Sequence, residues 1–375
     1  MSQSRQCCIQ LVILFFAIAA VGIYGQPADL VAPPIFSTTH ALNGAVILQI
    51  TSATPGAKIH YTIDDSIPTH DSQVYEAPFL VAANITVKAV AFDESKPGSA
   101  PLQSVIKSKS FILNVPSNAL IWSDEFSNNT GVPIEPNPAI WGYDTGHGGF
   151  GNHELETYCA FGSTTPPCDA ASPNAFVGTD GFLHIVARQP LPGVFTSARL
   201  KTADLLSFQY GRIEFKARVP EGQGLWPAAW LLGNNYASVR WPACGEQDVL
   251  ERVNEAKDPD WNEGSIHGIG FVGDKGIGTV YKFPKGDVAA EWHNYGMIWK
   301  KGSVAFYVDD PSHPYAVNTP EDLKKFPGSV WPFDAGQANY IILNLAVGGD
   351  WPGSPNASTK FPAEMQVDYV RIYSN

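Results

Sequence analysis

Apolar and polar residues alternate along much of the chain, and this alternation predicts β-strands. Between Arg212 and Val219, every even-numbered residue is charged and every odd-numbered residue is apolar. A strand with this pattern has one buried face and one solvated face. Further runs with strand character, bounded by turn residues, occur at residues 45–50, 58–63, 84–92, 182–187 and 367–373. No long helical period is present, so an all-β protein is predicted.

The strands fall into two regions of different character. Residues 30–114 predict a small N-terminal β-sandwich domain, with a turn at residues 54–57 and no obvious catalytic constellation. Residues 115–118 form the expected linker. Residues 119–375 are dense in Trp, Gly and Asn, and their recurring short strands suit a β-jelly-roll sandwich. The small module is expected to serve as a spacer or to bind carbohydrate.

Composition and charge narrow the class of ligand. Of the 375 residues, 12% are aromatic and only 16% are charged, with 34 Gly and 30 Pro, as in a turn-rich globular protein. The formal net charge of −12 argues against nucleic acid or an anionic membrane as partner. A neutral ligand such as a sugar fits this charge, and a monomer is expected.

The N-terminus has the pattern of a secretory signal. Arg5 precedes an apolar run from Ile9 to Ile23 that is too short for a comfortable membrane span and is followed by small residues. We expect a signal peptide at residues 1–25, and therefore a secreted or periplasmic protein with no membrane association after cleavage. An uncleaved anchor is the alternative.

The cysteines agree with export. Cys7 and Cys8 would leave with the signal peptide, and Cys159, Cys168 and Cys244 would remain. An oxidising compartment permits a Cys159–Cys168 disulfide. The sequence contains no CxxC or HxxxH spacing, so a metal site built on such a motif is not expected.

The stretch Gly245–Glu251 contains three carboxylates within six residues. In a flat strand, Glu246 and Asp248 share one face and Glu251 points to the other. One β-bulge between Asp248 and Glu251 would return Glu251 to the first face. Three acids on one surface repel each other, so this arrangement is expected only where chemistry uses it. The alternative is three solvated acids on an exposed face.

Tryptophans surround this stretch in sequence. Trp226, Trp230, Trp241 and Trp351 all lie near turn-rich or acidic segments. The apolar face of a sugar ring stacks on indole while the indole N–H remains a donor, so these four residues are predicted to bind substrate. Core packing is the alternative for Trp230.

Three polar residues complete the predicted binding set. The Asn152 amide can bind sugar hydroxyls with both of its polar atoms, and Arg199 offers a fork of donors. His267 lies in a strand-like segment, where a hydrogen-bonded core histidine is the alternative.

Taken together, these features resemble glycoside hydrolase family 16, in particular its laminarinase-like branch. The resemblance covers residues 119–375 and rests on Trp122–Phe126, Gly151–Leu155, Thr196–Arg199, Gly224–Gly233, Gly245–Glu251, His267–Gly268, Asn344–Gly349 and Val367–Arg371. It implies a curved jelly roll with a concave substrate cleft that binds β-glucan polysaccharide or oligosaccharide. Residues 30–114 similarly resemble the fibronectin-like domain found beside chitobiase and other glycan-active enzymes.

The resemblance also implies residue roles. Glu246 would be the nucleophile, Asp248 the assisting acid and Glu251 the general acid/base of a retaining glycosidase, which needs two carboxyls about 5–5.5 Å apart. Ionised Glu246 and Asp248 are expected to raise the pKa of Glu251. Gln247 stands where the family usually has Ile, and we expect it to face away from the cleft.

Catalysis would need no cofactor, but the family often carries a structural calcium away from the cleft. The matching positions are Glu125, the carbonyl of Gly181, and Asp368, whose oxygen ligands suit calcium. A melting temperature unchanged by chelator would count against this ion.

The expected function is a secreted endo-β-1,3-glucanase. A mixed-linkage β-1,3-1,4-glucanase, or another hydrolase or transglycosylase of the family, is the alternative within this class. A non-catalytic β-glucan-binding protein is the alternative from another class, although such proteins usually lose the acids that are present here.

Overall fold

The computed structural model describes residues 31–95, 102–254 and 260–375. The expected signal peptide, with Cys7 and Cys8, lies outside these residues. Within them, no helix is long and apolar enough to cross a membrane. The helical segments are short, of one or two turns each: η1 (Leu42–Gly44), η2 (Gly149–Gly151), α1 (Tyr236–Val239), η3 (Gly273–Lys275) and η4 (Pro320–Lys325).

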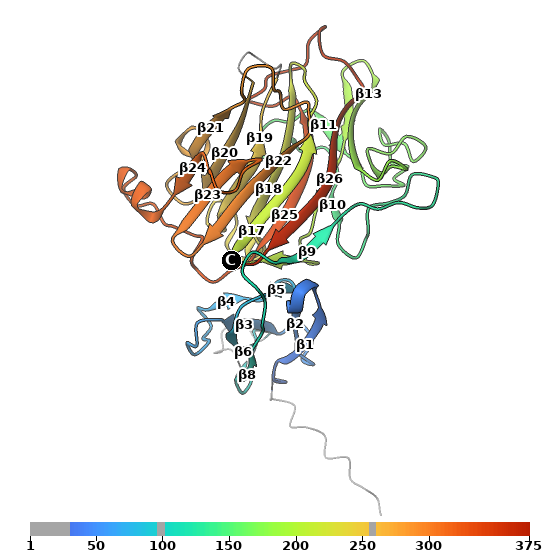
Figure 1. The fold of residues 1–375 in the computed structure, drawn as a ribbon. Coiled ribbons are helices and arrows are strands. Elements are labelled where there is room, and N and C mark those ends of the chain that lie inside the picture. Colours follow the sequence, from blue (N-terminus) through green and yellow to red (C-terminus); the bar gives the residue numbers. More distant parts are fainter. Residues whose placement is uncertain (1–30, 96–101, 255–259) are drawn as a thin grey trace, which may run out of the picture. The chain divides into compact units, whose positions relative to one another are not determined.

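Two large sheets build the region after residue 118, as the all-β prediction requires, and the first of them also includes three strands of the N-terminal module (Figure 1). The first has the order β1 (Ile35–His40), β2 (Val46–Thr51), β5 (Phe79–Val81), β16 (Ser207–Phe208), β25 (Asn339–Val347), β18 (Leu225–Gly233), β19 (Glu246–Glu251), β20 (Trp261–His267) and β21 (Ile277–Lys282). Its two remaining strands are β15 (Arg199–Lys201), which pairs with β25, and β10 (Gly142–Asp144), which pairs with β15.

The second large sheet has the order β11 (Glu156–Tyr158), β14 (Val194–Ser197), β13 (Leu183–Leu191), β26 (Ala363–Tyr373), β17 (Gly211–Arg218), β22 (His293–Lys300), β23 (Ser303–Val308) and β24 (Ala316–Asn318). Its two remaining strands are β12 (Ala175–Val177), which pairs with β13, and β9 (Leu120–Asp124), which pairs with β26.

The main core lies between these two sheets. The odd-numbered apolar residues predicted to be buried on β17, including Phe215, are fully buried and share one apolar cluster with Leu343 and Leu345 of β25. The opposite face of β25 and of its neighbours β18 and β19 carries polar and aromatic side chains. We call this opposite face of the first sheet the site face.

A smaller sheet completes the N-terminal module. Its order is β4 (Gln73–Val74), β3 (Lys58–Thr62), β6 (Ile85–Asp93) and β7 (Leu102–Gln103), with β8 (Lys107–Phe111) on β6. Apolar residues of β3 and β6 pack against residues of β2 and β5 in a second core, so the predicted small sandwich is present.

One sheet of this sandwich continues into the jelly roll, which sequence reasoning did not predict. Strand β5 pairs in parallel with β16, with Phe79 opposite Ser207 and Leu80 opposite Phe208. Because side chains alternate along a strand, Phe79 and Val81 enter the module core while Leu80 enters the main core. Residues 31–375 form one compact unit, and the domain boundary at residues 115–118 stays a prediction from sequence.

This shared strand predicts how the protein unfolds. Leu80→Ala removes a buried side chain that links β5 to the main core, and should lower the free energy of unfolding by about 2–5 kcal/mol. Unfolding of Leu80→Ala, monitored by tryptophan fluorescence and by calorimetry, should still show one transition. Its midpoint should be lower than that of the wild type. Leu102→Ala, at a more exposed position of the same module, serves as the control. A separate early transition for the module in Leu80→Ala would contradict a shared cooperative unit.

Candidate active site

The predicted bulge is present in β19. The register between β18 and β19 shifts by one residue between Ala229 and Trp230, which leaves Val249 as the extra residue. Val249 and Leu250 are consecutive, yet both are fully buried in the main core. The extra residue therefore restores Glu251 to the site face, as the sequence predicted.

The start of β19 is fixed by a glycine. Gly245 has a φ of +78°, and a Cβ atom there would lie 2.7 Å from Cγ of Pro332. Only glycine fits this conformation and this space. The backbone therefore enters β19 immediately before Glu246 with a defined direction.

Strand β20 supplies partners for the first two acids. Asp248 lies opposite Ser265, whose Oγ donates a hydrogen bond to Asp248 Oδ2 at 2.6 Å. Glu246 lies opposite His267, whose Nε2 is 3.3 Å from Asp248 Oδ2 and 3.9 Å from Glu246 Oε1. A single imidazole thus lies between two carboxylates.

Two indoles bind the outer acids. Nε1 of Trp226 donates a hydrogen bond to Oε1 of Glu251 at 3.0 Å. The side chain of Trp241 hydrogen-bonds Glu246. Trp241 is also 44% exposed, so it combines a contact to the predicted nucleophile with an open aromatic surface.

Burial and charge set the protonation of this cluster. Burial, with the charge of Asp248, raises the pKa of Glu251 well above its ordinary value and that of Glu246 to about 8. Burial opposes the charged form of His267, but the hydrogen bond to Asp248 and the nearby carboxylates raise its pKa to about 9. His267 therefore carries a positive charge at neutral pH.

Burial and Asp248 raise the pKa of Glu246 as well, so the expected ionisation of Glu246 depends on its neighbours. Repulsion between Glu246 and Glu251 favours states in which one of them is charged and the other is protonated. His267 lies 3.9 Å from Glu246 and favours placing the negative charge there. That distribution is the one an attacking carboxylate and a proton-donating carboxyl require.

Residues 172–371, which include β19 and β20, match the sequence model for glycosyl hydrolases family 16. The chain belongs to glycosyl hydrolase family 16. Residues 48–103 match the Fn3 associated model, in agreement with the fibronectin-like character of the module. The protein is therefore a glycoside hydrolase, and its resemblance to the family is confirmed.

Similar proteins and a similar solved structure support membership of this family. A beta-glucanase of Rhodothermus marinus is 37% identical over 262 residues, covering 68% of this chain and 84% of the relative. Glucan endo-1,3-beta-glucosidase A1 of Niallia circulans is 34% identical, and the match covers 68% of this chain but only 37% of that protein. The catalytic domain of an endo-1,3-beta-glucanase (laminarinase) from Thermotoga petrophila RKU-1 superposes with a TM-score of 0.58 and 36% identity, covering 68% of this chain and 98% of that one.

We call Glu246, Asp248 and Glu251 the triad. The other predicted binding residues of this family 16 enzyme lie around the triad in two groups. In the first group, the Arg199 guanidinium stacks on the Trp230 ring at 4.7 Å and pairs with Asp144 Oδ2 at 3.0 Å. Nε1 of Trp230 donates to Oδ1 of Asn344 at 2.8 Å. Trp230 is thus half-buried on the site face and is not a residue of the main core.

The second group lies near Trp226. Trp351, 42% exposed, packs edge-to-face on Trp226 at 5.5 Å and lies 6.0 Å from Trp261. Asn152 Nδ2 donates to Glu154 Oε1 at 3.0 Å, and the carbonyl of Asn152 accepts from the backbone N–H of residue 350 at 2.9 Å. These contacts orient Asn152 beside the tryptophans.

Sequence reasoning missed several members of the site. Ser265 could have been found, because it lies two residues before His267 on one strand and must share its face. Trp261 and Asn344 had the same signal of strand alternation. Glu156 supports the end of β25 behind the site and gave no such signal: it is fully buried and accepts a hydrogen bond from the backbone N–H of Val347 at 2.6 Å.

Two oddities of the acid stretch have a packing explanation. Gln247 is fully buried and faces away from the site, where its Oε1 accepts a hydrogen bond from Asn339 Nδ2 at 2.9 Å, as predicted. Cys244 packs in a small apolar cluster with Leu232 and Ile342. Burial raises the pKa of the Cys244 thiol to about 12, so it is unreactive. The predicted Cys159–Cys168 disulfide is present.

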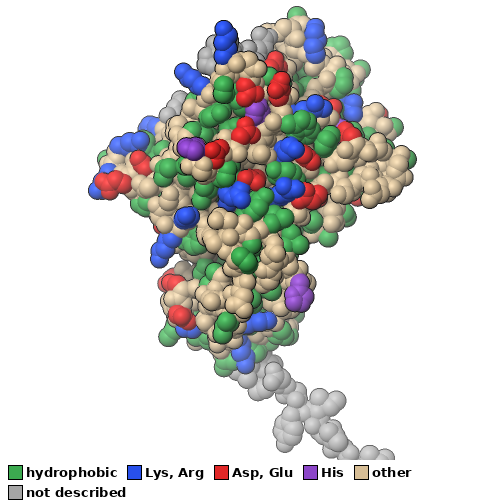
Figure 2. All heavy atoms as spheres, in the orientation of Figure 1, with side chains coloured by type: hydrophobic (Ala, Val, Ile, Leu, Met, Phe, Trp, Pro, Cys, Tyr) green, Lys and Arg blue, Asp and Glu red, His purple; other side chains and the backbone are tan. Residues whose placement is uncertain are grey.

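The residues expected to bind calcium belong to the second large sheet and its loops. Glu125 accepts two hydrogen bonds from Arg371, at 2.9 and 2.8 Å, and Asp368 pairs with Lys216 at 2.8 Å. Acidic and basic side chains are interspersed over the face shown in Figure 2. A calcium ion would compete with both cations, so these carboxylates and Gly181 do not form a ready-made cation site. Calcium stays a prediction, and no chemistry is assigned to it.

The electrostatics of the triad predict two opposite shifts in the pH profile of hydrolysis. A general acid must be protonated, so with Glu251 in this predicted role activity should be lost as the pH rises through its pKa. Asp248→Asn removes a neighbouring negative charge, lowers that pKa, and should move the alkaline limb to lower pH. Trp226→Phe removes a donor to the ionised form and should move the limb to higher pH.

Initial rates of reducing-end release measured across pH check both shifts. Glu321→Gln removes an exposed carboxylate on η4 and controls for the change in net charge. Alkaline limbs that move in the same direction in both variants would contradict the assignment of that limb to Glu251.

Proposed function

We propose that this family 16 enzyme is a secreted, retaining endo-β-1,3-glucanase that cleaves internal bonds of laminarin-type glucans. The observation that carries the chemistry is the bulge at Val249, which places three carboxylates on one face with an imidazolium and two indole donors. The linkage preference rests on relatives named as laminarinases or endo-1,3-β-glucosidases. Secretion rests on the signal-like N-terminus and agrees with the disulfide.

In the first step, the carboxyl of Glu251 donates its proton to the glycosidic oxygen as the C–O bond breaks. The carboxylate of Glu246 attacks the anomeric carbon from the opposite side and forms a glycosyl ester. His267 and Trp241 hold negative charge on Glu246 before the attack. Asp248, held by Ser265, keeps His267 protonated through its negative charge.

In the second step, the carboxylate of Glu251 accepts a proton from a water molecule, which attacks the same carbon. The ester bond breaks, Glu246 leaves as a carboxylate, and Glu251 is again protonated. Two inversions give retention of the anomeric configuration. Trp241 contacts Glu246, whereas Trp351 packs on Trp226, the partner of Glu251. The exposed faces of these two indoles would stack with neighbouring glucosyl rings.

Glu246→Ala and Glu251→Ala should each reduce laminarin hydrolysis by about 10²–10⁴-fold or more while the melting temperature stays near that of the wild type. An aryl β-glucoside oligomer with a good leaving group separates the roles. It needs little protonation, so Glu251→Ala should retain its first step and Glu246→Ala should not. Glu321→Ala is the matched surface control. Near wild-type laminarin hydrolysis by either triad variant would refute its assigned role.

A product profile on laminarin, lichenan, agarose and xyloglucan tests the substrate. We expect oligosaccharides released from laminarin, with the β-anomer formed first in an NMR time course. Release mainly from lichenan would replace the proposal by mixed-linkage glucanase activity. Binding of laminarin without any release would favour a β-glucan-binding protein.

A further inference from the structure

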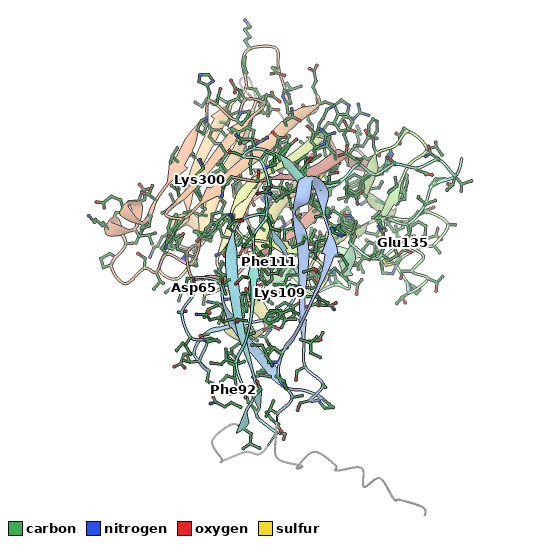
Figure 3. The ribbon with its side chains drawn as sticks, turned by 60° about the horizontal axis from the view of Figure 1, so that its bottom comes forward. Asp65, Phe92, Lys109, Phe111, Glu135 and Lys300 are labelled. Atoms are coloured by element: carbon green, nitrogen blue, oxygen red, sulfur yellow. A yellow bond between two sulfur atoms is a disulfide. The ribbon has the colours of Figure 1, made fainter. Side chains whose placement is uncertain are left out.

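A second cluster of metal-binding side chains lies in the N-terminal module, apart from the catalytic triad. His60, His70 and Glu94 each offer one ligand atom, and these atoms lie within 4.8 Å of one another. His60 is on β3, His70 is in the loop after β3, and Glu94 directly follows β6. Phe92, labelled in Figure 3, contacts both imidazole rings edge-on at 5.2 Å.

His60 is prepared as a ligand. It is only 3% exposed, and its Nδ1 lies 2.8 Å from the carbonyl oxygen of Ser72. A carbonyl can only accept, so Nδ1 carries the proton and Nε2 presents a lone pair. Among the described residues, Nε2 of His60 has no hydrogen-bond partner. A histidine bound to metal through one nitrogen commonly donates its other N–H to such a carbonyl.

The two other ligands are more exposed than His60. His70 is half-exposed, its ring stacks on His60 at 5.1 Å, and its Nε2 lies 2.7 Å from Glu94 Oε1. Ligand atoms around a tetrahedral ion with bonds of about 2.1 Å are about 3.4 Å apart. The cluster must therefore contract by roughly an ångström, which side-chain rotation of His70 and Glu94 can supply.

We propose that His60, His70 and Glu94 form a zinc site that ties the loop after β3 to the end of β6. Two imidazoles and one carboxylate suit zinc, whereas calcium and magnesium require mainly oxygen ligands. Water completes the coordination. The proton shared by His70 and Glu94 passes to solvent on binding.

Lys58 opposes the ion and provides a sharp test. Its Nζ pairs with Glu94 Oε2 at 2.7 Å, leaving Oε1 for the metal. The ammonium repels a cation, so Lys58→Met should tighten zinc binding. His70→Ala removes an exposed ligand without disturbing the module core and should weaken it.

The binding experiment uses the full-length, tag-free chain carrying Asp248→Asn. This background is needed because Glu246, Asp248 and His267 are also close enough to hold a metal. Zinc titration by calorimetry should give one site and a raised melting temperature. His70→Ala and Glu94→Gln each remove a ligand and should weaken zinc binding by more than the roughly 10–100-fold that loss of an outer-shell partner typically costs. His40→Ala, at an exposed histidine on β1, should leave it unchanged.

Cobalt provides an independent signature, since a tetrahedral site with imidazole ligands gives intense visible absorption. That absorption should be lost in His70→Ala and kept in His40→Ala, and calcium or magnesium should not shift the melting temperature. Equal zinc affinity in the background protein and in His70→Ala would overturn the proposal. So would weaker binding in Lys58→Met.

Discussion

The repulsion among three carboxylates on one strand face is the constraint around which the site is built. A regular strand would separate them, because Glu251 would point into the core. The bulge at Val249 brings them together and at the same time sends two consecutive apolar side chains into the core. The burial of Val249 and Leu250 therefore helps to hold Glu251 in place. Packing on one side of the sheet stabilises an electrostatically unfavourable arrangement on the other.

The partners of the acids convert this repulsion into a defined distribution of charge. A positive His267 lies nearest to Asp248 and Glu246, whereas Glu251 has a neutral indole donor. Negative charge is thus best accommodated at one end of the strand and a proton at the other. The same strand pairing that positions the side chains fixes these partners, since Ser265 and His267 lie opposite Asp248 and Glu246 on β20.

Much of this arrangement could be predicted from local sequence. Alternation located the strands, and the spacing of the acids predicted the bulge, because both depend only on the two-residue period of a strand. Long-range partners such as Asn344 and Glu156 depend on strand order, which the local pattern does not encode. The raised pKa of Glu246 depends on burial from several elements, so it could not be inferred from neighbouring residues alone. The pairing of Glu125 with Arg371 and of Asp368 with Lys216 also depends on the register of β26, so it could not be predicted from the sequence.

The parallel pairing of β5 with β16 has a consequence for solubility. A strand at the edge of a sheet exposes unpaired backbone N–H and C=O groups, which can template pairing with another chain. In this enzyme β5 covers that edge of β16. The module thus pairs the backbone groups of β16 and moves the free edge of the catalytic sheet outward to β1, the last strand in the sheet order. This structural role requires no sugar ligand.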